Sequence, residues 1–128
     1  MHIIHSIDEM QSLSEKLRKE GGKIGFVPTM GYLHEGHLSL VNLVKEQTDT
    51  VILSIFVNPI QFGKGEDLDK YPRDLDGDMK LCQERGVDIV FIPKGVEMYR
   101  KGHSTLIQEE IVSQGLCGKT RSSHFQGV

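Results

Sequence analysis

The sequence predicts an α/β fold built on a parallel sheet. Three short runs rich in apolar and β-branched residues alternate with stretches of helical periodicity, which is typical of β-α-β units. These runs cover residues 23–27, 50–57 and 88–92. The middle run is apolar almost throughout, as expected of a strand buried on both faces. The 128 residues suffice for one compact domain.

The first elements follow from local signals. Residues 1–4 are a candidate short strand. Ser6 and Glu9 have the spacing of a capping box, which predicts that a helix begins there. Its apolar residues share one face: Met10, Leu13 and Leu17. The pair Gly21-Gly22 ends the helix, and the strand that follows is expected to end at Pro28.

The next helices are predicted in the same way. Residues 37–47 carry Leu40, Val41 and Val44 at helical spacing. Asp74 or Asp76 is expected to cap a helix that runs to Arg85. Its inward residues are predicted to be Leu75, Met79 and either Leu81 or Cys82.

Beyond the strand at 88–92 the signals weaken. Residues 96–99 are expected to make one helical turn, and residues 104–114 an edge strand or hairpin. Ligands of parallel sheets bind outside the carboxyl ends of the strands. We therefore expect the loops at 28–37, 58–73 and 93–99 to converge on one side.

Composition excludes several classes of protein. A net charge of −3 gives no reason to expect a nucleic-acid-binding face, and 38% hydrophobic residues argue against disorder. No apolar run approaches the ~20 residues that span a bilayer. The N-terminus does not resemble a signal peptide, so a cytoplasmic location is expected. Cys82 and Cys117 have neither disulfide-framework nor zinc-knuckle spacing and are expected to be buried or half-buried free thiols.

The loop after the strand predicted at residues 23–27 carries the candidate chemistry. Gly31 permits a special backbone conformation, and Gly36 lets a ligand approach the helix start. His34 and His37 are three residues apart, so one helical turn places both rings on the same side. Two imidazoles beside a helix N-terminus suit a polyphosphate, because both features stabilise negative charge.

Two other interpretations of the histidines are weaker. A zinc site is disfavoured because no third ligand is close in sequence and the HExxH spacing is not met. Surface histidines without a role are disfavoured by the glycines and by the strand-loop-helix context. Asp78 is interpreted as a solvated or capping charge, with contact to Mg²⁺ through water as the alternative.

Residues 29–37 resemble the His-x-Gly-His signature of adenylyl-transferring enzymes. The longer string is similar to that of the pantoate–β-alanine ligase (pantothenate synthetase) family. Further matching segments are Phe56–Gly63, Glu66-Asp67, Tyr71–Arg73 and Asp88–Phe91. The resemblance implies a truncated Rossmann-like parallel sheet of the HxGH nucleotidyltransferase superfamily. It makes residues 1–128 the N-terminal part of the ATP-binding domain, with the C-terminal lid domain absent.

The resemblance also implies a reaction in the coenzyme A pathway. The carboxylate of (R)-pantoate attacks the α-phosphorus of ATP, and pyrophosphate leaves. The amine of β-alanine then attacks the pantoyl adenylate, which gives pantothenate and AMP. Mg²⁺ accompanies the nucleotide, no protein metal ligand is expected, and the full-length family forms homodimers.

Residue roles are carried over by position. Eight consecutive residues would line the ATP site: Met30, Gly31, Tyr32, Leu33, His34, Glu35, Gly36 and His37. His37 would be the proton donor, and His34 would help to hold the phosphates. Gln61 would bind pantoate close to the β-alanine site, with Asn58 and Tyr71 beside it.

The resemblance stops short of the whole family chain. The Lys-Asp-x-x-Gln segment, the Ser-Ser-Arg-Asn segment and the lid belong to a later part of that chain, so this polypeptide is expected to bind ATP weakly and to catalyse poorly. The family's Arg-Pro-Gly-His-Phe segment reads Arg121-Ser122-Ser123-His124-Phe125 here. The alternatives are a non-catalytic nucleotide-binding remnant and another HxGH nucleotidyltransferase.

Overall fold

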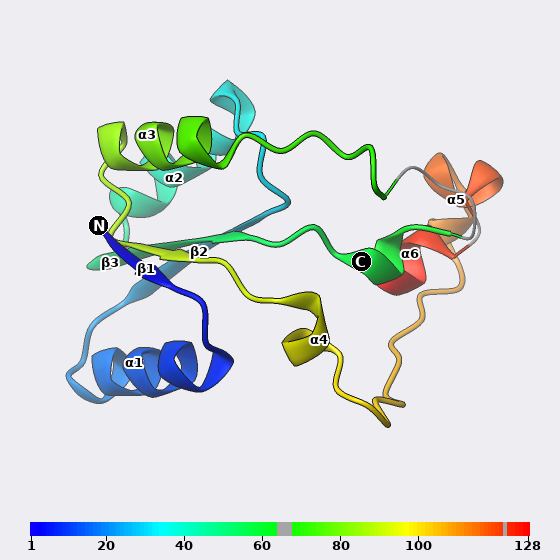
Figure 1. The fold of residues 1–128 in the computed structure, drawn as a ribbon, viewed down its shortest axis with the longest axis horizontal. Coiled ribbons are helices and arrows are strands. Elements are labelled where there is room, and N and C mark those ends of the chain that lie inside the picture. The colour runs from blue at the N-terminus through cyan, green and yellow to red at the C-terminus, as the bar shows by residue number, and fades with distance from the viewer. Residues whose placement is uncertain (64–67, 122) are drawn as a thin grey trace. The chain divides into compact units, whose positions relative to one another are not determined.

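The computed structural model describes residues 1–63, 68–121 and 123–128 (Figure 1). Glu66, Asp67 and Ser122, which the sequence analysis singles out, lie outside the described residues. The chain divides into two compact units. The sheet unit comprises Met1–Phe56 and Pro72–Met98, and the second unit comprises Val57–Tyr71 and Tyr99–Val128.

The sheet unit contains a four-stranded parallel sheet, which confirms the predicted fold class. The strands lie in the order β1-β4-β3-β2. Their bounds are His2–Ile4 for β1, Ile24–Thr29 for β2, Thr50–Ile55 for β3 and Ile89–Phe91 for β4. Ile24 pairs with Thr50, and Ile52 pairs with Ile89. β2 and β3 therefore end together, and the chain leaves both at the same edge.

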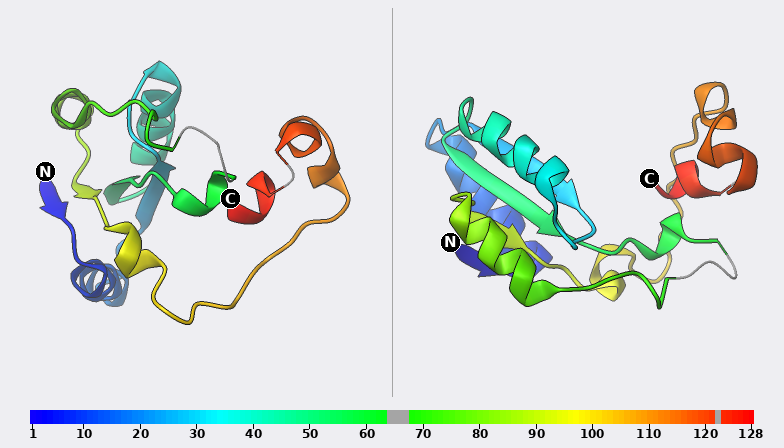
Figure 2. Two further views of the ribbon diagram at one scale, coloured as in Figure 1. Left: turned by 45° about the vertical axis from the view of Figure 1, so that its right-hand side comes forward. Right: turned by 90° about the horizontal axis from the view of Figure 1, so that it is seen from above.

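Helices cover the sheet on both faces (Figures 1 and 2). α1 (Ile7–Lys19) packs on one face, and α2 (Glu35–Lys45) and α3 (Leu75–Glu84) pack on the other. Alternation along β3 serves both layers, since Val51 and Leu53 belong to the core under α2 and α3 and Ile52 belongs to the core under α1. α4 (Gly95–Met98) is the single turn that the sequence predicts.

One predicted strand boundary is wrong. The sequence ends the second strand at Pro28, but β2 continues through Pro28 to Thr29. Proline has no N–H to donate and is therefore tolerated on an edge strand. Among the described residues, β2 pairs only with β3. The carbonyls of Lys23 and Thr29 accept from the chain of β3, and backbone groups alternate along a strand, so Pro28 faces the open edge and removes no hydrogen bond from the sheet.

The predicted helix caps agree with the structure better than the predicted buried faces do. Ser6 caps α1 and accepts a hydrogen bond from the N–H of Glu9, and Asp74, not Asp76, caps α3. Cys82 is buried, as predicted, but Leu75 is 47% exposed and does not face the core. Leu75 is the first residue of α3, and the buried residues of this helix, Asp78 and Cys82, follow it.

The second unit is built from short helical turns. They are η1 (Pro59–Gln61), η2 (Val112–Gln114), α5 (Cys117–Thr120) and α6 (His124–Gly127). The strand or hairpin predicted at 104–114 is wrong. Leu106 is 61% and Ile107 87% exposed, and the described residues of this unit offer no strand to pair with. Across the described chain, no helix is both long and apolar enough to cross a bilayer.

Candidate functional site

The candidate site begins where β2 ends. The Thr29 hydroxyl donates to the Ser54 carbonyl on β3 at 2.7 Å and accepts from the N–H of Gly31 at 3.1 Å. Gly31 has φ +80° and Tyr32 has φ +53°, so two consecutive residues are left-handed. That conformation is ordinary for glycine and rare for tyrosine. The chain therefore turns sharply from the strand into the start of α2.

His34 and His37 lie together at the N-terminus of α2, as the sequence predicts. Their ring centroids are 4.1 Å apart. His34 is the N-cap residue, and its Nδ1 accepts from the N–H of Gly36 at 3.1 Å. The N–H of His34 donates to Nδ1 of His37 at 3.3 Å. The two imidazoles thus cap the helix reciprocally, in the manner of a capping box.

These hydrogen bonds determine what the rings present to a ligand. An Nδ1 that accepts a hydrogen bond leaves the proton of the neutral ring on Nε2. Each histidine then offers an Nε2–H donor beside the positive end of the helix dipole. Burial and the neighbouring His34 lower the pKa of His37 below 6.5, against the opposing effect of Asp78. His37 is therefore neutral at pH 7.

Gly36 has a structural role beside the ligand approach that the sequence predicts. A Cβ at this position would lie 2.8 Å from Cε1 of the His34 ring. The missing side chain therefore makes room for the imidazole itself. Beside it, the exposed Glu35 carboxylate accepts from the Arg85 guanidinium at 2.7 Å, which ties the start of α2 to the end of α3.

Asp78 is the residue whose role the sequence analysis missed. It lies on α3 with only 3% of its surface exposed, and its carboxylate accepts hydrogen bonds from the N–H groups of Tyr32 and Leu33. It is neither solvated nor a helix cap. The contact joins residues 45 and 46 positions apart, so no local pattern indicates it.

The predicted substrate residues belong to the second unit. Asn58 is 8% exposed; its Nδ2 donates to the Gly127 carbonyl, and its Oδ1 accepts from the N–H of Ile60 and the hydroxyl of Tyr99. The backbone carbonyl of Gln61 accepts from Arg121 and faces His124 Nδ1 at 3.0 Å.

Tyr71 completes this predicted set. Its ring packs edge-on against Phe62, with centroids 5.9 Å apart. Asn58 is buried and hydrogen-bonded within this unit, whereas Gln61 and Tyr71 are half-buried. Hydrogen bonds of Asn58 and Gln61 therefore join η1 to α6 and to Arg121 within the second unit.

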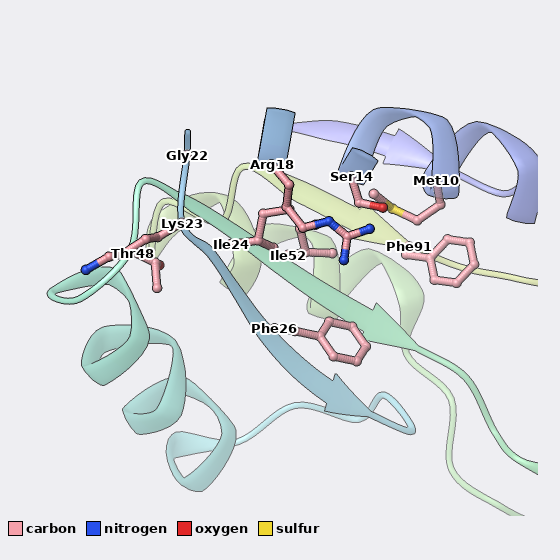
Figure 3. Close-up of a pocket in the computed structure, with 10 residues that line it drawn as sticks. All are labelled: Met10, Ser14, Arg18, Gly22, Lys23, Ile24, Phe26, Thr48, Ile52 and Phe91. Atoms are coloured by element: carbon pink, nitrogen blue, oxygen red, sulfur yellow. The ribbon is translucent and has the colours of Figure 1, made fainter. Parts of the chain in front are cut away.

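A groove of about 750 Å³ lies elsewhere on the sheet unit (Figure 3). Its floor is apolar and includes Ile24, Phe26, Ile52 and Phe91, and Arg18 of α1 reaches over it. Phe26 is 55% exposed there. The groove shares no residue with the loop at 30–37, so it is separate from the histidine pair.

The acidic and histidine side chains do not assemble a metal-binding cluster. Within the part of the chain that the structure describes, no three His, Cys, Asp or Glu residues are arranged to hold a metal ion. At the start of α2, the two imidazoles and the helix N-terminus supply hydrogen-bond donors.

Comparison with known proteins gives consistent matches. The profile of the family described as pantoate-beta-alanine ligase matches residues 2–128. Pantothenate synthetase from Caldicellulosiruptor bescii is 53% identical over the whole chain, which covers 45% of that protein. Pantothenate synthetase from Heliobacterium modesticaldum is also 53% identical, and 46% of it is covered. The chain spans about half the length of the curated relatives it matches.

Solved structures agree with the sequence matches. Pantothenate synthetase from Thermus thermophilus superposes with a TM-score of 0.89 at 45% identity, over 99% of this chain and 45% of that one. Pantoate-beta-alanine ligase from Francisella tularensis gives 0.91 at 41% identity, over 99% of this chain and 49% of that one. The Francisella protein was solved in complex with beta-gamma ATP and beta-alanine.

Proposed function

The chain belongs to the pantoate-beta-alanine ligase family, and from this premise we propose that its residues 30–37 bind ATP for the synthesis of pantothenate. One observation carries the proposal: two imidazoles at the start of α2, each of which accepts a backbone hydrogen bond at Nδ1. Both present an Nε2–H donor. Such donors, next to a helix N-terminus, suit the oxygens of a triphosphate.

The proposed reaction has two steps. A carboxylate oxygen of (R)-pantoate attacks the α-phosphorus, and the bond from that phosphorus to the bridging oxygen of pyrophosphate breaks. The β-alanine amine then attacks the acyl carbon, and AMP leaves with the former carboxylate oxygen. Negative charge builds on the departing pyrophosphate in the first step, so fixed donors there lower the barrier.

His34 and His37 share this task in the proposal. Since both Nδ1 atoms are engaged by the backbone, the rings cannot rotate freely and their Nε2–H groups keep their direction. His37, neutral at pH 7, binds the phosphate chain through its Nε2–H and stabilises the charge on the leaving pyrophosphate as a hydrogen-bond donor, without giving up that proton. His34, as the N-cap residue, holds a neighbouring phosphate oxygen.

Mg²⁺ fits this site as a companion of the nucleotide. The described residues offer no three-ligand cluster, and the carboxylate of Asp78 is turned toward backbone N–H groups. Mg²⁺ keeps much of its water shell and often binds through substrate phosphates. When bound, it would neutralise charge on the triphosphate, and His34 and His37 would supply the protein's own donors.

Pantoate recognition is proposed for the second unit. Gln61 carries an amide that both donates and accepts, which suits a hydroxy acid. Tyr71 lies edge-on to Phe62, and Asn58 holds η1 through its contacts with Ile60 and Tyr99. We expect Gln61 to contact pantoate and β-alanine directly, with Asn58 acting through the shape of the loop.

We propose that residues 1–128 are the N-terminal part of the ATP-binding domain and that a lid domain belongs to the rest of the family chain. The chain alone is then expected to bind nucleotide and not to complete the condensation, because water reaches an uncovered adenylate.

We place the protein in the cytoplasm, where free thiols such as Cys82 and Cys117 persist. A homodimer is proposed for the full-length protein.

Nucleotide binding is tested directly on the chain. Addition of Mg²⁺ and a non-hydrolysable ATP analogue to ¹⁵N-labelled protein should shift the amide resonances of residues 30–37. His34→Ala and His37→Ala should each weaken binding about tenfold or more, the loss of roughly one charge-assisted hydrogen bond. His5→Ala, outside the loop, is the control. Shifts confined to other residues would contradict the proposal.

The reaction is tested by isotope exchange in a chain extended to the family's full length. Pantoate-dependent exchange of labelled pyrophosphate into ATP should occur there and be lost with His37→Ala. Mixing this chain with a separately expressed second half should restore ligase activity if both halves fold. Tight nucleotide binding with no exchange in the extended chain would favour a remnant that only binds nucleotide.

A further inference from the structure

Asp78 connects α3 to the loop that carries the histidines. Its Oδ2 accepts from the N–H of Tyr32 at 2.9 Å, and its Oδ1 accepts from the N–H of Leu33 at 2.7 Å. Both oxygens of one buried carboxylate are therefore committed to consecutive peptide groups. Buried charge is costly unless it is satisfied by hydrogen bonds of this kind.

The two peptide groups need such a partner. Gly31 and Tyr32 are both left-handed, and successive N–H groups in turns of this kind point into one concavity that attracts an anion. In this protein Asp78 occupies the concavity. A Cβ on Gly31 would lie 3.0 Å from Asp78 Oδ2, so the loop and the carboxylate fit closely.

The same contact sets the position of the histidines. Leu33 is 9% exposed and packs in the core under α2 and α3, and the next residue, His34, caps α2. The N–H of His34 then fixes the His37 ring. The anchoring of Tyr32 and Leu33 therefore fixes the backbone from which the His34 and His37 rings extend.

We propose that Asp78 is a positioning residue, whose carboxylate holds the peptide groups of Tyr32 and Leu33 so that His34 and His37 face the triphosphate. The inference rests on the proposed nucleotide site. It assigns no contact between Asp78 and the nucleotide.

The test compares Asp78→Asn with Asp76→Asn in the 128-residue chain. Both changes remove one negative charge from the first turns of α3, but Asp76 is exposed. Charge alone would strengthen the binding of a polyphosphate in both variants. We expect Asp78→Asn instead to weaken binding of the Mg²⁺–ATP analogue at least tenfold, because the amide places an N–H₂ against a backbone N–H. Asp76→Asn should change affinity less than twofold.

A second readout does not depend on nucleotide. Asp78→Asn should move the ring resonances of His34 and His37 and the amide resonances of Tyr32 and Leu33 in the ligand-free protein. Val87→Ala, a core substitution under α2 and α3, should lower stability and leave those ring resonances in place. This comparison separates positioning from a general loss of stability.

The outcomes distinguish the inference from the proposed function. If the wild-type chain binds no nucleotide, the proposed function fails, and the ring and amide resonances alone decide the role of Asp78. If Asp78→Asn does not fold, Asp78→Glu, which keeps the charge and shifts it by one methylene, should fold and bind more weakly than wild type. Unmoved histidine resonances together with wild-type affinity in the folded variant would overturn the inference.

Discussion

At the scale of single residues, the neutral state of His37 has a consequence for stability. Its pKa in the folded chain lies below 6.5, because of burial and His34. The unfolded chain therefore binds the proton more readily than the folded chain does. Linkage then requires that this group's contribution to stability is complete above pH 6.5 and is lost as pH falls toward the folded pKa.

We therefore expect acidification from pH 7 toward pH 5 to lower the free energy of unfolding by more in wild type than in His37→Gln. Urea unfolding at several pH values measures this difference, and an NMR titration of the His37 ring gives its midpoint directly. A His37 midpoint above 6.5 would contradict the expectation.

The two cysteines differ sharply in their environments. Burial, with a smaller effect from Asp78, raises the pKa of the Cys82 thiol to about 11. Cys117 is exposed, so the prediction of a buried or half-buried thiol is wrong at this position. Thiolates are the reactive form. We expect a disulfide reagent at pH 8 to modify one thiol per native chain promptly and the second only on unfolding. Cys117→Ser should remove the prompt reaction, and rapid modification of both thiols would refute the assignment.

At the scale of elements, a substitution at the start of α2 should change ligand binding without changing the stability of the helix. Gly36→Ala should not weaken the helix, since alanine is more favourable than glycine by up to about 1 kcal/mol within a helix. The added Cβ, however, would lie 2.8 Å from the His34 ring and push it aside. Displacing the ring also loses its cap on the Gly36 N–H, which offsets the gain in helix propensity. We expect nearly unchanged thermal stability together with about tenfold weaker binding of the ATP analogue, a loss of about 1.4 kcal/mol.

Calorimetry and thermal unfolding of the same sample measure both quantities. Asn42→Ala, on an exposed part of the same helix, is the control and should leave binding unchanged. Parallel loss of stability and of binding in Gly36→Ala would show that the glycine is required by the helix and not by the ring.

The elements also show how far sequence reasoning reaches. Hydrophobic periodicity and capping residues predict the strands and helices of the sheet unit. They succeed there because a neighbouring element buries the apolar face of each one. The run at 104–114 has strand-like composition, but the described residues offer no neighbouring strand to pair with it, so composition alone misleads there. The role of Asp78 escapes prediction because its partners, Tyr32 and Leu33, are distant in sequence. The histidine pair is predictable because His34 and His37 are three positions apart, and one helical turn then places both rings on the same side.

The sheet unit depends on the core under α2 and α3. Leu53 lies at the centre of β3 with 0% exposure, and it packs in one cluster with Val41 and Val90. Leu53→Ala should cost about 2–5 kcal/mol, the range for a buried leucine. Leu43→Ala, at a 54% exposed position of α2, should cost far less. Urea unfolding measures both, and similar losses would contradict the assigned core.

At the scale of the whole molecule, apolar burial is divided unequally between the two units. All buried hydrophobic side chains among the described residues, from Ile4 to Val90, belong to the sheet unit. The second unit depends on hydrogen bonds, such as Asn58 to the Gly127 carbonyl and Tyr99 to Asn58. A single such bond contributes about 1 kcal/mol, whereas apolar burial drives folding. Folding of the chain should therefore be determined by the sheet unit.

A chain that ends at Met98 tests this division. It keeps both cores, and we expect it to unfold cooperatively and to protect the amides of β3 and β4 from hydrogen exchange as the whole chain does. The amides of Ile60 and Gln61 should exchange rapidly in it, because Asn58, which caps η1, loses its partners Tyr99 and Gly127. The loop at 30–37 and Asp78 remain, so the ATP analogue should still shift the His34 and His37 resonances. An unfolded chain would mean that folding also requires residues 99–128. A folded chain that no longer responds to nucleotide would mean that the histidine site requires them.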